Sequence, residues 1–92
     1  MRNRQREKFL QTYVYREDES FFVSTGYRQS SASLAPDNWY FETFAWELVD
    51  GTNERKEKII ADNSGAASEK FALEQHMEVV RQLQDTGFFS NN

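Results

Sequence analysis

The sequence predicts an α+β domain in which a four-stranded antiparallel sheet, made of two hairpins, carries one C-terminal amphipathic helix on one face. Three observations predict this class. Trp39–Val49 is the longest apolar run and reads as a central strand. Segments in which apolar and polar residues alternate lie on either side of it, separated by short polar turns. Ser68–Asp85 has the apolar spacing of a helix. Ninety-two residues make one small domain with a single core, so we treat 1–92 as one domain.

The first hairpin is expected over residues 9–27. Residues 1–8 form a polar, basic lead-in, and Phe9–Tyr15 then alternates between apolar and polar positions. A charged turn, Glu17 to Ser20, connects it to a second alternating segment, Phe21–Tyr27. The short link predicts an antiparallel pair, and Gly26 marks a natural position for a β-bulge.

Residues 28–38 form the one long loop. They are rich in serine and include Pro36, the only proline of the chain. Loops of this length in small domains are often functional, but a plain connection between strands explains the segment equally well.

Residues 39–49 are predicted to be the central strand. One face would carry Thr43 and Ala45, and the other Phe44 and Trp46, so both faces are apolar. Because the strand is longer than the usual five or six residues, we expect a bend or bulge near Thr43–Ala45. Its aromatic residues are interpreted as core, with no cofactor role.

Asp50-Gly51 is a strong signal for a two-residue hairpin turn, after which a return strand is expected over residues 52–62. The first half of this return strand is charged or polar. Such a pattern is typical of an edge strand protected against aggregation, and a projecting β-finger that grips a partner would show the same pattern. The sheet is therefore expected over residues 9–62, followed by a turn at residues 63–66.

The helix is expected over residues 67–86, with its apolar positions on one stripe. Gly87 fits the left-handed position after the helix, and Phe88 would then contact Leu83 in a Schellman motif. Phe88 and Phe89 are expected to pack back onto the sheet, and residues 87–92 form a C-terminal tail.

Composition and charge exclude several classes of protein. The absence of cysteine excludes disulfides and thiolate metal sites and suits a reducing cytoplasm. No apolar run approaches the length of a membrane span, and the N-terminus lacks the apolar core of a signal peptide. Residues 1–8 carry a net charge of +3 and the remaining chain −7, so the acidic body opposes bulk binding to duplex nucleic acid.

Catalytic and metal-binding patterns are missing from the sequence. His76, the only histidine, lies on the apolar stripe of the helix and is interpreted as a core residue with a satisfied ring nitrogen. The carboxylates are scattered, and the four glycines do not form a phosphate-binding loop. We therefore expect a protein that is not an enzyme and that uses neither metal nor cofactor.

The remaining candidates for function are surface residues that could contact a macromolecule. The candidate partner-binding or RNA-binding residues come from the basic tip, the serine-rich loop and the charged hairpin arm: Arg2, Arg4, Arg6, Arg28, Gln29, Ser30, Ser31, Asn53, Arg55, Lys56 and Lys58. An acidic face could in turn imitate a phosphate row toward a basic partner, and its candidates are Glu17, Asp18, Glu19, Glu74 and Glu78.

One pair of motifs resembles a known group. Tyr40–Trp46, with a Glu-Thr pair on a strand, followed by Ala72–His76 on a helix, is similar to a pattern in short phage-encoded proteins. Size, lack of cysteine, acidic balance and the sheet-plus-helix layout resemble phage anti-CRISPR proteins directed at the type I-F surveillance (Csy) complex. The motif covers only the central strand and the helix, and it carries over no contact residue.

This resemblance implies a non-catalytic, stoichiometric inhibitor in the host bacterial cytoplasm. It would dock on Cas proteins and possibly their guide RNA, compete with target DNA, and bind neither a small-molecule substrate nor a membrane. Target recognition there needs guide RNA to pair with DNA inside a basic channel. The basic residues would approach the guide RNA and the acidic residues the Cas subunits.

Two other functions stay open. A small structural or scaffold protein of phage or bacterial origin could dimerise through a strand edge. An enzyme would have to depend on His76. Since one predicted helix can cover only one face of the sheet, the other face is where a hydrophobic interface is expected.

Overall fold

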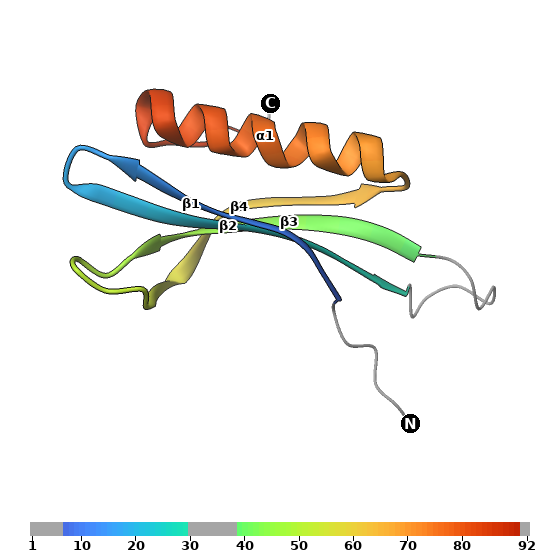
Figure 1. Ribbon diagram of the computed structural model, residues 1–92, viewed down its shortest axis with the longest axis horizontal. Helices are drawn as coiled ribbons and strands as arrows, with labels where there is room; N and C mark the ends of the chain where they lie inside the picture. Colours follow the sequence, from blue (N-terminus) through green and yellow to red (C-terminus); the bar gives the residue numbers. More distant parts are fainter. Residues whose placement is uncertain (1–6, 30–38, 91–92) are drawn as a thin grey trace.

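The computed structural model describes residues 7–29 and 39–90 and contains one sheet with one helix on it (Figure 1). This is the predicted α+β fold. The four strands are β1 (Glu7–Arg16), β2 (Glu19–Gln29), β3 (Trp39–Leu48) and β4 (Arg55–Ala66). The helix α1 (Glu69–Thr86) follows them.

The strands are ordered β1-β2-β3-β4 and every neighbouring pair is antiparallel. Among the described strands, β1 and β4 therefore form the two edges of the sheet. The register aligns side chains across it, because Phe22 lies opposite Tyr13 on one side and opposite Trp46 on the other. These three residues consequently share one row and one face.

The core lies between the sheet and α1. Alternation along β3 places Ala45 toward the helix and Phe44 and Trp46 on the opposite side, as predicted. The buried core residues of this side come from all four strands, the helix and the C-terminal segment: Val14, Phe21, Val23, Ala45, Ala61, Val79, Val80, Leu83 and Phe89. We call the opposite side of the sheet the open face, because no described helix or strand packs on it.

Bulges were expected in β2, at Gly26, and in β3, but the extra residues lie in the neighbouring strands β1 and β4. Between Lys8 and Leu10 the pairing with β2 shifts, so the extra residue Phe9 lies in β1 and not at Gly26. Along β3, the extra residues again belong to the partner strand β4, which is longer than β3. An irregularity does occur beside the predicted position, between Ala45 and Trp46, but its extra residue is Ile60 of β4, so the expectation that β3 itself carries the bulge was wrong.

The second hairpin has a longer connection than expected. Asp50 and Gly51 do occupy the turn, and the Thr52 N–H donates to the Val49 carbonyl at 3.0 Å. The Thr52 hydroxyl then accepts from the Glu54 N–H at 3.1 Å, which delays the start of β4 to Arg55. β4 also runs on through residues 63–66, which were expected to form a turn; Gly65, with φ 102°, is accommodated there.

Specific caps define both ends of α1. The Ser68 side chain accepts a hydrogen bond from the Phe71 N–H at 3.2 Å, as an N-cap residue does. At the other end Gly87 is left-handed, and its N–H donates to the Leu83 carbonyl at 2.9 Å. The Phe88 N–H donates to the Thr86 hydroxyl instead of Leu83, so the ending is a simple αL motif and not the predicted Schellman motif. Phe89 is buried as predicted, whereas Phe88 is exposed.

Replacing Gly87 with alanine is expected to lower the free energy of unfolding by about 1–2 kcal/mol, because a non-glycine residue is strained at its φ of 73°. A Cβ there would also lie 2.9 Å from Glu19 Oε1, which must move aside. Gly51→Ala is the matched control, because Gly51 has φ 72° in open space. Urea unfolding of both variants should show Gly87→Ala as the more destabilising; equal values would mean that the Glu19 contact adds nothing.

Candidate binding surface on the open face

A row of aromatic side chains crosses the open face. The rings of Tyr13 and Phe22 have centroids 5.0 Å apart, and those of Phe22 and Trp46 are 6.1 Å apart at an interplanar angle of 22°. The row ends on β4, where the Arg55 guanidinium lies 4.4 Å above the Trp46 ring. One residue from each strand thus contributes to what we call the aromatic row: Tyr13, Phe22, Trp46 and Arg55.

The aromatic row is accessible from solvent. Tyr13 is 44% exposed, Phe22 and Trp46 are partly buried by one another, and Arg55 is exposed. Buried and half-buried aromatic rings with a nearby arginine are the residue types that dominate the energy of macromolecular interfaces. Of these four residues the sequence analysis named only Arg55 as a binding residue, although it expected a hydrophobic interface on the face that the helix leaves uncovered. The strand register is what brings Tyr13, Phe22 and Trp46 together.

Two ion pairs tie further predicted cations to the sheet. Arg28 Nη2 lies 2.8 Å from Oε2 of Glu42, whose side chain is almost fully buried. Lys56 Nζ lies 3.1 Å from Glu47 Oε2. Lys58 lines a groove near the end of α1, together with Phe88 and Ile59. The predicted basic arm therefore does not present one continuous positive patch, since its cations are distributed among separate partners.

Some predicted residues lie outside the described part of the chain. These are Arg2, Arg4, Arg6, Ser30 and Ser31. Gln29 is the last residue of β2, opposite Trp39, and its side chain is likewise outside the description.

The predicted acidic residues form two separate groups. Glu17, Asp18 and Glu19 line a polar cleft of about 400 Å³ between the turns of the two hairpins, and Asn53 contributes to its other wall. Its polar lining differs from the mostly apolar walls of typical small-molecule pockets. Glu74 and Glu78 lie instead on the exposed surface of α1, so the five carboxylates do not form one acidic face.

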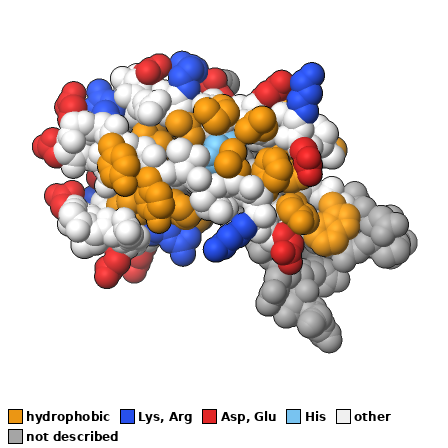
Figure 2. Space-filling model, viewed as in Figure 1, with side chains coloured by type: hydrophobic (Ala, Val, Ile, Leu, Met, Phe, Trp, Pro, Cys, Tyr) orange, Lys and Arg blue, Asp and Glu red, His pale blue; other side chains and the backbone are white. Residues whose placement is uncertain are grey.

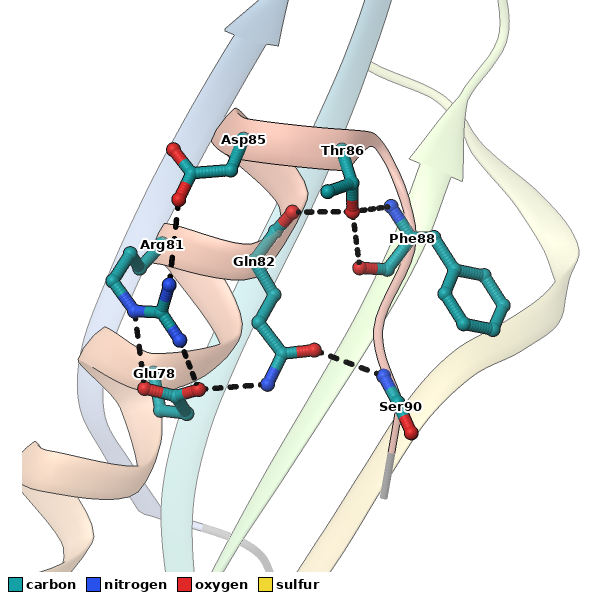
Figure 3. Close-up of polar contacts among 7 residues, drawn as sticks. All are labelled: Glu78, Arg81, Gln82, Asp85, Thr86, Phe88 and Ser90. Atoms are coloured by element: carbon teal, nitrogen blue, oxygen red, sulfur yellow. Dashed lines mark hydrogen bonds and ion pairs between the residues drawn. The ribbon is translucent and has the colours of Figure 1, made fainter. Parts of the chain in front are cut away.

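Glu78 belongs to a polar cluster at the end of the helix (Figure 3). It accepts hydrogen bonds from Arg81 and from Gln82, and Arg81 also reaches Asp85 at 3.3 Å. These hydrogen bonds, first that of Arg81, lower the pKa of the Glu78 carboxyl. Gln82 also accepts from the Ser90 N–H at 3.0 Å, which links the helix to the C-terminal segment. This carboxylate is therefore engaged in local structure.

His76 is the centre of a buried hydrogen-bond chain between α1 and the sheet. Its Nε2 lies 2.8 Å from the Thr12 hydroxyl and its Nδ1 lies 2.7 Å from the Thr25 hydroxyl. Thr25 in turn bonds Thr43 at 2.7 Å. Burial lowers the pKa of His76 to about 4, so the ring is neutral near pH 7. The prediction of a core histidine with satisfied ring nitrogens is confirmed.

Two residues of this network, Thr43 and His76, also belong to the motif that resembles phage proteins. Glu42, Thr43, Ala72 and His76 are all buried. Thr43 and His76 are connected through Thr25, which the motif does not include. These four residues therefore belong to the interior of the strand and the helix, and none of them is placed to contact a partner.

Within residues 7–29 and 39–90, no group of three or more histidine, cysteine or acidic side chains is placed to hold a metal ion. The helix in this part of the chain is not long and apolar enough to cross a membrane. Comparison with known proteins identifies no matching family model, no matching curated protein and no matching solved structure.

Proposed function

We propose that this chain is a non-catalytic binding protein that docks on a macromolecular partner through the open face of its sheet. The observation that carries this proposal is the aromatic row, which spans all four strands and ends in Arg55 stacked on Trp46. A rigid sheet holds these side chains in fixed positions, so little conformational entropy is lost when a partner covers them.

The surroundings of the aromatic row suit a binding surface. The Arg28–Glu42 ion pair provides polar groups on the same face, farther along β2 and β3. A polar rim around an aromatic centre is the usual composition of protein interfaces. Trp46 is the expected energetic centre, because it contacts Phe22, Phe44 and Arg55 at once.

The partner that we propose is a type I-F CRISPR–Cas surveillance complex, whose binding of target DNA the protein would block. Support for this identity comes from the resemblance described above, in size, acidic balance and the motif of Tyr40–Trp46 with Ala72–His76. Because Glu42, Thr43, Ala72 and His76 of this motif are buried, the resemblance bears first on the fold, and the partner needs a direct test.

Trp46→Ala is expected to weaken binding to the partner at least about tenfold, because truncating a central aromatic residue typically costs 1–2 kcal/mol or more. Arg55→Glu should also weaken binding, because it reverses the charge that lies over the Trp46 ring. Binding of the pure protein to a purified type I-F complex, by biolayer interferometry, and the loss of target DNA binding in a gel-shift assay are the two measurements.

Phe71→Ala is the matched control, since Phe71 is an exposed aromatic residue on the helix side of the molecule. It should bind as the unmodified protein does. No binding by the unmodified protein would refute the partner and leave the open face to be tested by pull-down from a bacterial lysate. Equal binding by Trp46→Ala would refute the open face as the docking surface.

A second candidate function is a structural protein that dimerises through a strand edge. It is favoured by the outer edge of β1, where no charged residue occurs from Phe9 to Tyr15.

A further inference from the structure

The two edges of the sheet differ in their protection against pairing. β4 begins with four consecutive charged residues, Arg55 to Lys58, and carries Asp62 further on. β1 has seven consecutive uncharged residues, Phe9–Tyr15, and no proline. Edge strands that must not pair with other chains usually carry charges or proline. The composition of the β1 edge is therefore that of an edge strand that pairs with another chain. The composition of β4 is that of an edge strand protected against such pairing.

The helix adds an exposed apolar flank above this same edge. Leu73 and Met77 are 45% and 49% exposed. An α-helix turns 100° per residue, so around the helix axis Leu73 and Met77 lie between Val80 and Arg81. Val80 is buried against the sheet. In Figure 3 Arg81 lies on the β1 side of α1 and Gln82 on the side of β3 and β4. Leu73 and Met77 consequently project over the outer edge of β1.

The space-filling view supports this arrangement. Figure 2 looks onto the molecule from the side on which β1 lies in front in Figure 1. Hydrophobic side chains gather over the middle of this face, and most of the charged side chains lie around its rim. An apolar centre with a charged rim is the composition expected of a protein interface.

We propose that the β1 edge binds a second copy of this chain, so that β1 and its mate pair antiparallel and two sheets become one of eight strands. This inference rests on the second candidate function above, dimerisation through a strand edge, and is independent of the partner proposed for the open face. An antiparallel pair of identical strands requires a two-fold axis perpendicular to the sheet. Both helices then lie on the same face, and the two aromatic rows meet on the other.

Of the registers that stay clear of the shift between Lys8 and Leu10, the one that places Tyr13 opposite Tyr13 of the second copy pairs the longest part of β1. The paired segment then runs from Leu10 to Arg16 and stays clear of the shift between Lys8 and Leu10. A register centred on Thr12 would instead place Lys8 opposite Arg16 and include that shift. Like charges directly opposite one another destabilise a strand pair.

The helices are positioned to meet in this register. His76 lies over β1 and β2, because its Nε2 is 2.8 Å from the Thr12 hydroxyl of β1 and its Nδ1 is 2.7 Å from the Thr25 hydroxyl of β2. Met77, the next residue on the β1 side, therefore lies near the two-fold axis. Two antiparallel helices that flank one strand pair come within about 10 Å of each other, which is the ordinary distance of packed helices. Leu73 and Met77 of the two copies would fill the space between them.

The first test uses two similarly exposed apolar residues on opposite flanks of α1. The unmodified protein, measured by sedimentation velocity from about 1 to 100 μM, should show a species of twice the 10.9 kDa chain mass. Met77→Glu should raise the dimer dissociation constant at least about tenfold, because two carboxylates would face each other near the axis. Phe71→Glu, on the flank away from β1, should leave it unchanged.

The second test fixes the register. The chain has no cysteine, so a single introduced cysteine reports on one position alone. Tyr13→Cys should form a disulfide-linked dimer under mild oxidation, whereas Glu57→Cys on the exposed β4 edge should stay monomeric on a denaturing gel. Circular dichroism checks the fold of each variant. A monomer at all concentrations, a Met77→Glu variant that dimerises normally, or equal cross-linking of both cysteine variants would each overturn the proposal.

Discussion

Replacing Thr25 with valine is expected to lower the free energy of unfolding by about 2–4 kcal/mol. The Thr25 hydroxyl bonds both His76 Nδ1 and Thr43 Oγ1, and all three side chains are fully buried. Valine keeps the shape of threonine but removes both hydrogen bonds. Each buried polar atom left without its partner costs about 1–3 kcal/mol. Urea unfolding at pH 7, followed by circular dichroism, measures the loss.

Thr86→Val is the matched control for this change. The Thr86 hydroxyl also takes part in hydrogen bonds, to the Gln82 carbonyl at 3.0 Å among others, but it is exposed (Figure 3). Water can replace its partners, so the expected cost is below about 1 kcal/mol. Adding His76→Leu to Thr25→Val should cost less than the sum of the single changes, because both partners of one hydrogen bond are then absent. Strict additivity, or equal costs for Thr25→Val and Thr86→Val, would contradict the network.

The sequence was sufficient to predict where the chain is buried and how the strands follow one another. Alternation along β3 separated the faces correctly, and helical spacing placed His76 on the buried stripe of α1. Both signals are local, because each depends on the period of one element. The hydrogen-bond partners of His76 come from β1 and β2, and their identity depends on the strand register and on the height of the helix above the sheet. Neither quantity is encoded in a short stretch of sequence.

The ends of the elements were predicted less well, for a related reason. The Thr52 side chain occupies backbone groups that would otherwise extend the β3–β4 ladder, so β4 begins at Arg55. The Thr86 hydroxyl similarly binds the Phe88 N–H and turns Phe88 toward solvent. Threonine is common in strands and helices as well as at their ends, and its competing hydrogen bonds are visible only once the chain is folded.

The candidate binding residues show a further limit of composition and charge. Arg28, Arg55 and Lys56 were grouped because they are basic and near loops. In the folded protein each lies against a different residue: Glu42, Trp46 and Glu47. The three aromatic members of the row, Tyr13, Phe22 and Trp46, are residues that alternation alone would assign to a second core layer. Their role as a candidate surface follows from the single helix, which covers only one side of the sheet.

Acidification from pH 6.5 to pH 4 is expected to destabilise the fold by about 3 kcal/mol through His76 alone. Burial lowers the pKa of His76 to about 4 from its ordinary value of 6.5. Between these two values the unfolded chain binds a proton at this residue and the folded chain does not, so stability falls as the pH falls. The slope approaches 1.4 kcal/mol per pH unit. Above pH 6.5 this contribution is fully present, and below pH 4 no more is lost through this residue.

His76→Gln isolates this contribution, because an amide can donate and accept hydrogen bonds near Thr12 and Thr25 but does not titrate. The variant should lose less stability than the unmodified protein between pH 6.5 and pH 4, in urea unfolding series at each pH. Glu78 also has a lowered pKa, but its effect belongs to lower pH and is common to both proteins, so it cancels in the comparison. Parallel pH profiles for the two proteins would contradict a buried, neutral His76. A variant that keeps its binding activity would in addition remove the remaining argument for an enzyme, since that argument depends on this histidine.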